Sequence, residues 1–227
     1  MSHSLTNLRF AAFCAWVDIR NLFARTRLGT LWNSIGLFII IAAIGVFFGA
    51  ILKGELTGYG EYIPFLATGI LVWAFLSVTI NESCSVFGTR AQVLRHTAYP
   101  FAATPLILML KNLFILVQNM FLAMIVYVLF FWSVEIDFLS LLPGLFLVAV
   151  NVLWISLLAA IACTRFRDLP QLVSGTLHLG FFLTPIIWQE HFLGRYIFLV
   201  ELNPFYHLVS LVRLPLLGIA TPTATWV

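Results

Sequence analysis

Charged side chains are scarce in this sequence. Lysine, arginine, aspartate and glutamate together make up 9% of the 227 residues, against about a quarter of an ordinary soluble domain. So few charges cannot cover the surface of a water-soluble protein of this size, and hydrophobic residues reach 62%. The composition therefore excludes a soluble domain and indicates an integral membrane protein.

Motifs of catalysis and metal binding are missing as well. The three cysteines, Cys14, Cys84 and Cys163, have no metal-ligand spacing, and the five histidines contain no H-E-x-x-H pair. No phosphate-binding loop of the form G-x-x-x-x-G-K-[ST] occurs, so the chain does not hydrolyse ATP by that route. We expect no catalytic residue, metal or cofactor in this chain. The net charge of +3 is too small to argue for nucleic acid.

Long apolar runs are what the sequence does contain. A hydrocarbon core about 30 Å thick needs roughly 20 apolar residues per helix, and a helix satisfies its own backbone hydrogen bonds in lipid. The runs are continuous rather than alternating, so we predict an all-α integral membrane fold, a polytopic helical bundle, and not a barrel. We expect one transmembrane domain, 1–227, with spans at 30–52, 64–81, 104–134, 141–164 and, near the lower length limit, 172–188.

Basic residues lie mostly on one side of these spans. They precede the first span and occupy the loops after the second and the fourth, at Arg9, Arg20, Arg25, Arg27, Arg90, Arg95, Arg165 and Arg167. Most acidic residues fall on the opposite side. The positive-inside rule then predicts a multi-pass protein with a cytoplasmic N-terminus.

Two segments outside the spans have a mixed character. Segment 10–28 interleaves aromatic and aliphatic residues with charges, which predicts an amphipathic helix in the membrane interface; a plain juxtamembrane anchor is the alternative. Segment 190–219 is broken by prolines, glycines and charges, which predicts short gate or re-entrant helices at the outer face. Within the first span, Gly45 and Gly49 form a G-x-x-x-G pair that allows close helix approach.

Three ionisable residues lie within the expected spans or at their ends: Glu82, Lys111 and His178. Ionisable groups in a membrane are costly and are therefore candidates for function. Glu82 and Lys111 both lie near the cytoplasmic ends of their spans, where a lysine can reach the interface. This placement favours a structural ion pair over a proton relay, and we expect His178 to be a packing residue.

Several short motifs follow one another in order along nearly the whole chain. They read Arg-Thr-Arg-Leu-Gly-Thr-Leu-Trp at 25–32, Tyr-Ile-Pro-Phe-Leu-Ala-Thr-Gly-Ile-Leu-Val-Trp at 62–73, Asn-Glu at 81–82, Tyr-Pro at 99–100, Arg-Phe-Arg-Asp at 165–168, Thr-Pro-Ile-Ile at 184–187 and Leu-Asn-Pro-Phe at 202–205. This ordered set resembles the membrane (permease) subunits of ABC-2 type polysaccharide exporters, a group that includes exporters of O-antigen, capsule and teichoic acid.

The resemblance implies a set of partners. They are a second copy of the permease in a homodimer, two nucleotide-binding ATPase subunits that hold ATP and Mg²⁺, and a lipid-linked glycan such as the O-antigen of lipopolysaccharide biosynthesis. It also implies the bacterial inner (plasma) membrane. Members of the family resemble six-span proteins, whereas five spans are visible here. Either the chain is truncated before its final span, which we favour, or the protein lacks that span.

The resemblance also assigns roles by position. Candidates for coupling to the ATPase are Arg25, Arg27, Gly88, Arg90, Arg95, Arg167 and Asp168. Candidates for a periplasmic gate are Asn203, Pro204 and Arg213. Sugars have apolar C–H faces that stack on aromatic rings, and on this ground the candidates for the channel wall are Trp73, Phe75, Phe181, Phe182 and Trp188. For any single ring, packing or lipid contact is the alternative.

Two other functions belong to different classes. An ABC-2 permease for a lipid or a drug has the same architecture and another cargo. An ion-coupled secondary carrier using Glu82, Lys111 and His178 predicts internal repeats in the two halves of the chain, and we find none in the sequence. A structural membrane scaffold is a third alternative.

Overall fold

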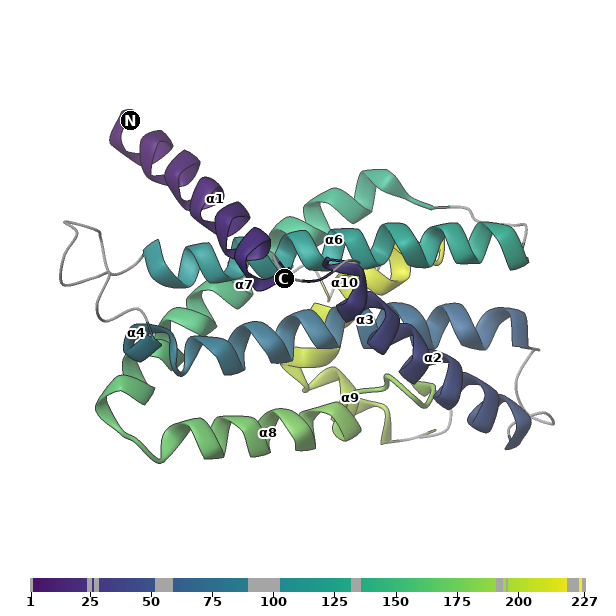
Figure 1. Ribbon diagram of the computed structural model, residues 1–227. Helices are drawn as coiled ribbons and strands as arrows, with labels where there is room; N and C mark the ends of the chain where they lie inside the picture. The colour runs from purple at the N-terminus through teal and green to yellow at the C-terminus, as the bar shows by residue number, and fades with distance from the viewer. Residues whose placement is uncertain are drawn as a thin grey trace. The chain divides into compact units, whose positions relative to one another are not determined.

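The computed structural model describes residues 2–23, 26, 29–51, 59–89, 103–131, 136–190, 194, 196–219 and 225, and most of these residues are helical. The helices follow one another in chain order (Figure 1) as α1 Ser2–Phe23, α2 Leu31–Ile51, α3 Tyr59–Ser83, α4 Val86–Thr89, α6 Ala103–Phe131, α7 Phe138–Arg165, α8 Leu169–Leu183, α9 Phe198–Glu201 and α10 Pro204–Leu216. No strand occurs in these residues. The predicted all-α fold is confirmed.

Four helices of the described part are long and apolar enough to cross a membrane: α2, α3, α6 and α7. They correspond to the expected spans 30–52, 64–81, 104–134 and 141–164. The largest difference is at the start of α3, which begins at Tyr59 although the apolar run begins only at Pro64. The chain is therefore a polytopic helical membrane protein.

The helix in the fifth expected span is shorter than 172–188. α8 ends at Leu183, and residues 184–188 form a bend. Pro185 accounts for this end, because proline has no backbone N–H and disfavours a helical conformation of the residue before it. The 15 residues of α8 extend about 22 Å at 1.5 Å per residue, less than the roughly 30 Å of a bilayer core. A fifth span stays a prediction.

Two threonine hydroxyl groups on the apolar helix α3 donate to the backbone of their own helix. The hydroxyl of Thr68 donates to the carbonyl of Pro64 at 2.8 Å, and the hydroxyl of Thr79 donates to that of Phe75 at 2.6 Å. These bonds satisfy the hydroxyl groups without a partner helix, as an apolar environment requires.

Asp137 caps the N-terminus of α7. Its Oδ1 accepts from the backbone N–H groups of Leu139 and Ser140, at 3.1 and 3.2 Å, and its Oδ2 accepts from the Ser140 hydroxyl at 2.5 Å. The hydrogen bond from the Ser140 hydroxyl, followed by those from the backbone, lowers the pKa of the Asp137 carboxyl from its ordinary value. The start of α7 is thus defined by a charged cap.

The helices belong to two compact units, of which the first comprises Met1–Trp32, Phe75–Leu116 and Ala149–Thr176. Here α1 packs on α6 through small side chains, since Ala11 and Ala15 are buried against Ile107. Trp16 also meets Phe114 edge to face, with ring centroids 5.5 Å apart. Close contact of α1 with α6 therefore depends on the alanines.

α1 covers the start of segment 10–28, whose predicted amphipathic character stays a prediction. Phe10, Phe13 and Trp16 are exposed, whereas Ala11, Ala15 and Ile19 are buried. The helix begins earlier than predicted, at Ser2, and it is described as far as Phe23. Its position in the membrane interface stays a prediction.

The second unit comprises Asn33–Ala74, Val117–Val148 and Leu177–Val227. Helix α10 is buried along much of its length. Two glycines allow neighbouring helices to approach it: a Cβ added at Gly144 of α7 would overlap the carbonyl oxygen of Leu211, and one added at Gly69 of α3 would overlap the guanidinium of Arg213. A larger residue at Gly144 would require a shift of backbone, whereas one at Gly69 would require the Arg213 guanidinium to move.

Candidate functional site

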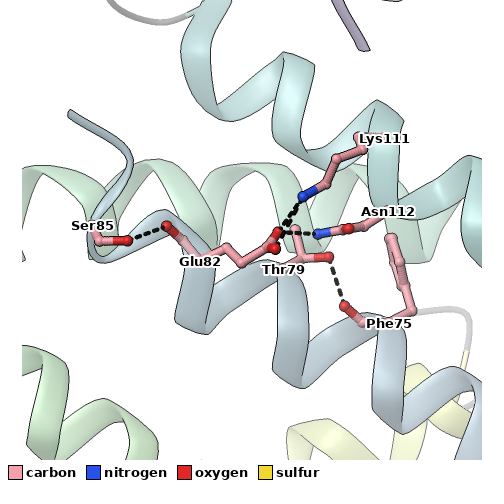
Figure 2. A network of polar contacts seen from close by, with 6 residues as sticks. All are labelled: Phe75, Thr79, Glu82, Ser85, Lys111 and Asn112. Carbon is pink, nitrogen blue, oxygen red and sulfur yellow. Dashed lines mark hydrogen bonds and ion pairs between the residues drawn. The ribbon is translucent and has the colours of Figure 1, made fainter. Parts of the chain in front are cut away.

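The most polar cluster described in the first unit joins the end of α3 to α6. Figure 2 shows the Glu82 carboxylate facing Lys111 and Asn112. The Lys111 Nζ lies 3.0 Å from Oε1 and 2.7 Å from Oε2 of Glu82, and the Asn112 Nδ2 donates to Oε2 at 2.9 Å. The Lys111 side chain is 9% exposed and that of Glu82 is 41% exposed. The result is an ion pair with a nearly buried cation and a half-exposed anion.

Local structure explains why Glu82 is the acceptor in this cluster. Thr79 and Ser83, its neighbours on α3, both donate to carbonyl oxygens of their own helix, to Phe75 and Ile80 (Figure 2 shows the bond from Thr79). Their hydroxyl groups therefore have partners without the side chains of α6. The Glu82 carboxylate has several lone pairs and takes both donors of α6.

A polar crevice of about 470 Å³ adjoins this ion pair. Its lining comes from α1, from the α3–α4 region and from α6, and consists of Asp18, Asn21, Glu82, Ser85, Val86, Thr89, Leu108 and Lys111. Two carboxylates and one ammonium group leave the lining acidic. The crevice thus brings the predicted interface helix α1 next to α4.

The expected ion pair between Glu82 and Lys111 is present. His178, the third member of the proposed relay, lies on α8 in the second unit and is exposed. The sequence identified the pair because both residues lie near the same end of their spans. Asn112 was missed, although it follows Lys111 directly.

The predicted coupling residues lie in three places. Gly88 is exposed on α4, and a Cβ added there would meet no atom within 4 Å. Arg167 and Asp168 are exposed in the turn between α7 and α8. The other four, Arg25, Arg27, Arg90 and Arg95, lie outside the described residues. The coupling role of all seven residues stays a prediction.

Four of the predicted wall residues form one aromatic cluster in the second unit. Trp73 lies 5.9 Å from Phe181 between ring centroids, and Phe181 lies 5.4 Å from Phe182. The indole N–H of Trp188 donates to the carbonyl of Phe182 at 3.1 Å. Phe205 of α10, which was not predicted, completes the cluster at 5.4 Å from Trp73.

The rings of this cluster differ in their exposure. Trp73 is 7% exposed, whereas Phe182 is 67% exposed. The fifth wall candidate, Phe75, is buried and belongs to the first unit. Phe182 is the member of the cluster whose ring is free to meet another molecule.

The predicted gate residues Asn203 and Pro204 begin α10. The Asn203 side chain accepts from the backbone N–H of Phe205 at 3.0 Å, and its amide donates to the Thr184 hydroxyl at 3.0 Å. Pro204 occupies the first turn, where its missing N–H costs nothing. Asn203 therefore both caps α10 and ties it to the bend after α8.

Arg213, the third gate candidate, is not at the surface. Its side chain is fully buried in the second unit. Its Nη1 donates to the carbonyl of Pro185 at 2.7 Å, and its Cζ lies 4.0 Å from the centroid of the Phe65 ring. A buried arginine on α10 thus contacts α3 and the bend after α8.

The sequence is similar to known membrane transport proteins. A family model described as ABC-2 type transporter matches residues 11–217. Two proteins from Klebsiella pneumoniae, each named O-antigen export system permease protein RfbA, are 25% identical over 198 and 199 residues, which cover 85% of this chain and 74% of each relative. A protein of the same name from Myxococcus xanthus is 26% identical over 177 residues, covering 74% of this chain and 65% of the relative.

Proposed function

The chain belongs to the ABC-2 type transporter family, and on this premise we propose that it exports a lipid-linked polysaccharide across the inner membrane as the permease subunit of an ATP-driven transporter. The similarity to three proteins named as O-antigen export permeases carries this proposal. It extends over most of the chain. The ATP is hydrolysed by a separate partner subunit, and the permease acts as a homodimer with its N-terminus in the cytoplasm.

Exposed apolar side chains support the membrane setting. Phe146, Leu158 and Ile161 of α7 are each more than half exposed, which lipid tolerates and water does not. Helix α1, with its exposed aromatic side chains, has the composition of a helix that lies in the headgroup layer.

The aromatic cluster of the second unit supports a glycan as the cargo. An aromatic ring attracts the apolar C–H face of a sugar without fixing its hydroxyl groups, so a chain of sugars can slide past it. Phe182 is the exposed ring of this cluster. We propose that Phe182 touches the cargo, and that Trp73, Phe181 and Trp188 hold it in place.

The polar cluster of the first unit supports a mechanical coupling to the ATPase. Closure of the two ATPase subunits pushes on α1 and on the loop that follows α4, which includes Arg90 and Arg95. The crevice beside Glu82 is lined by both α1 and α4, and the Glu82–Lys111 pair transmits the displacement to α3 and α6. ATP acts only through its different affinity for the two conformations.

Two experiments test the proposal. The first identifies the ATPase that co-purifies with the chain, and the second identifies the glycan that accumulates when its gene is deleted. We expect one ATP-binding protein to purify with the chain, and a lipid-linked glycan to accumulate on the cytoplasmic side after deletion of its gene. A permease for a lipid or a drug gives the first result without the second. Transport that a protonophore abolishes while ATP is held constant identifies an ion-coupled carrier instead.

A matched pair of phenylalanine substitutions tests the cargo contact. Phe182→Ala should slow glycan export by about tenfold, if a sugar on the ring contributes near the lower end of the roughly 1–3 kcal/mol of a nucleic-acid base stacked on an aromatic side chain. Phe146→Ala is the control, because Phe146 belongs to the same unit and is similarly exposed, at 70% against 67%. Equal export by the two variants would remove the contact role of Phe182.

A further inference from the structure

The bend at 184–188 interrupts the helical chain of the second unit directly after α8. Its residues Thr184 and Ile186 are fully buried. Backbone outside a helix has carbonyl groups without their usual partners, and in a membrane protein such groups need a partner from within the protein. The groups that donate to these carbonyls therefore decide which conformation the bend adopts.

Two hydrogen bonds connect α3 to the last turn of α8 through this bend. The hydroxyl of Tyr62 on α3 donates to the carbonyl of Ile187 at 2.8 Å. That carbonyl belongs to the peptide group that joins Ile187 to Trp188. The indole N–H of Trp188 in turn donates to the carbonyl of Phe182 at 3.1 Å. Tyr62 therefore fixes the backbone that carries the Trp188 ring, and this ring holds the end of α8.

The Phe182 carbonyl needs such a donor because α8 ends at Leu183. In a continuous helix it would accept from the backbone N–H of the residue four positions later, Ile186. That N–H donates instead to the carbonyl of Thr184 at 2.7 Å. The Trp188 indole thus replaces a backbone donor that the bend has removed.

The beginning of the bend has two supports of its own. The Nη1 of Arg213 donates to the carbonyl of Pro185 at 2.7 Å, and the amide of Asn203 donates to the hydroxyl of Thr184 at 3.0 Å. Neither contact involves Tyr62, which is 1% exposed and meets the bend at its other end. Loss of the Tyr62 hydroxyl alone should therefore leave the bend in place and loosen only the part that holds Phe182.

We propose that Tyr62 is a positioning residue for the Phe182 ring. Its hydroxyl fixes the peptide group between Ile187 and Trp188, and Trp188 holds the last turn of α8, from which the Phe182 ring is 67% exposed. The ring is thereby held in one place while its surface stays open to another molecule. This inference rests on the proposed function, because Phe182 is the side chain proposed to touch the glycan.

Two substitutions each break one hydrogen bond of this path and keep an aromatic ring. Tyr62→Phe removes the hydroxyl, and Trp188→Phe removes the indole N–H. The control is Thr68→Val, which removes a hydroxyl from the same helix and preserves the shape of the side chain. The Thr68 hydroxyl donates to the carbonyls of Pro64 and Phe65, at 2.8 and 3.0 Å, so both of its acceptors belong to α3 itself.

The first measurement is glycan export by the full complex with its ATPase, together with the rate of ATP hydrolysis. Tyr62→Phe should lower export by about fivefold, the order expected for one hydrogen bond, at an unchanged rate of ATP hydrolysis. In a chain that already carries Phe182→Ala, it should lower export no further. Thr68→Val should leave export unchanged. A hydroxyl that only stabilised the fold would lower export by the same factor in both chains.

The second measurement reads the position of residue 182 without any glycan. A nitroxide spin label is attached to Phe182→Cys, in a chain whose three native cysteines are replaced by alanine, and the complex is placed in lipid nanodiscs. Tyr62→Phe and Trp188→Phe should each increase the nanosecond mobility of the label. Thr68→Val should leave the spectrum unchanged.

An unchanged spectrum in Tyr62→Phe would overturn the inference, as would equal fractional losses of export with and without Phe182→Ala. If Tyr62→Phe does not assemble, Trp188→Phe decides the question, because it breaks the other hydrogen bond of the same path. Increased mobility at position 182 in a complex that exports no glycan would refute the proposed cargo and leave the positioning role of Tyr62 in place.

Discussion

The Glu82–Lys111 pair should respond unequally to the loss of its two members. The Lys111 side chain is 9% exposed and that of Glu82 is 41% exposed. Removal of the acid leaves an ammonium group in a nearly buried position. Removal of the lysine leaves a carboxylate that faces the polar crevice and keeps the hydrogen bond from Asn112 at 2.9 Å. Loss of Glu82 should therefore cost more.

The loss of stability from each substitution depends on how deeply the remaining charged partner is buried. Breaking a buried pair by removing one partner costs about 3–5 kcal/mol, and an exposed pair contributes about 0–1 kcal/mol. We expect Glu82→Gln to lower the free energy of unfolding by about 2–3 kcal/mol, because glutamine keeps an acceptor for Asn112. Lys111→Met should cost about 1–2 kcal/mol, because methionine preserves the apolar stem.

A double-mutant cycle in one detergent measures the pair directly. The variant with both substitutions leaves no unpaired charge, so it should be more stable than the sum of the single effects predicts, by about 1–3 kcal/mol. The control is Ser85→Ala, whose exposed hydroxyl donates only to the Glu82 backbone, at 3.2 Å, and it should change stability by less than about 0.5 kcal/mol. Additive single effects, or a larger loss for Lys111→Met, would refute the reasoning.

Three further outcomes are expected. The low pKa of the Asp137 carboxyl means that its ionised form stabilises the fold above the unfolded-state pKa, and that this stability is lost as the pH falls through the folded-state pKa. Asp137→Ala should thus lower the melting temperature at neutral pH, with a difference from the native chain that shrinks below about pH 4; a constant difference would contradict the role of the charge. Gly144→Ala, whose Cβ would overlap a carbonyl oxygen of α10, should destabilise the fold by about 1–3 kcal/mol in the same unfolding assay. Charge reversal of Arg90 and Arg95 together should stop export while ATP hydrolysis continues, and normal export with the protein in the membrane would exclude their coupling role.

The spans could be predicted from the sequence because lipid allows few structures. Segment 30–52 was expected to be helical, and α2 is Leu31–Ile51. A continuous apolar run in a bilayer has to be a helix, so its length and position are readable along the chain. The end of α8 was less accurate, because a single residue, Pro185, outweighs the apolar residues that continue beyond it.

The candidates for the channel wall were chosen as aromatic residues, and the helical periodicity of the sequence already separates two of them. Trp73 and Phe75 are two residues apart on α3, so their side chains point about 200° apart around the helix. A helical wheel therefore already argues against one shared wall, and the structure assigns the two residues to different units. Phe205 was missed because its contact with Trp73 joins segments more than a hundred residues apart, and nothing in the local sequence reports such a contact.

Helix contacts in a membrane protein depend on few residues. Lipid tails are as apolar as leucine, so apolar surface alone does not drive helices together, and close packing and polar contacts do. The G-x-x-x-G pair pointed to Gly45, where an added Cβ would meet Ile63 at an ordinary 3.5 Å. Among the described glycines, the shortest such contacts lie instead at Gly69 and Gly144, where the nearest atoms belong to α10.

A small number of stabilising contacts between helices suits a transporter, because such a protein has to change conformation. When two arrangements both expose apolar side chains to lipid, the hydrophobic term nearly cancels between them. The balance is then set by the few polar contacts that differ between them. Under the proposed function, the ATP-binding partner has to supply only the difference between these contacts. Buried charges at Lys111 and Arg213 are therefore the places where such a chain can be switched, and substitutions there should change transport more than substitutions of the lipid-facing apolar residues.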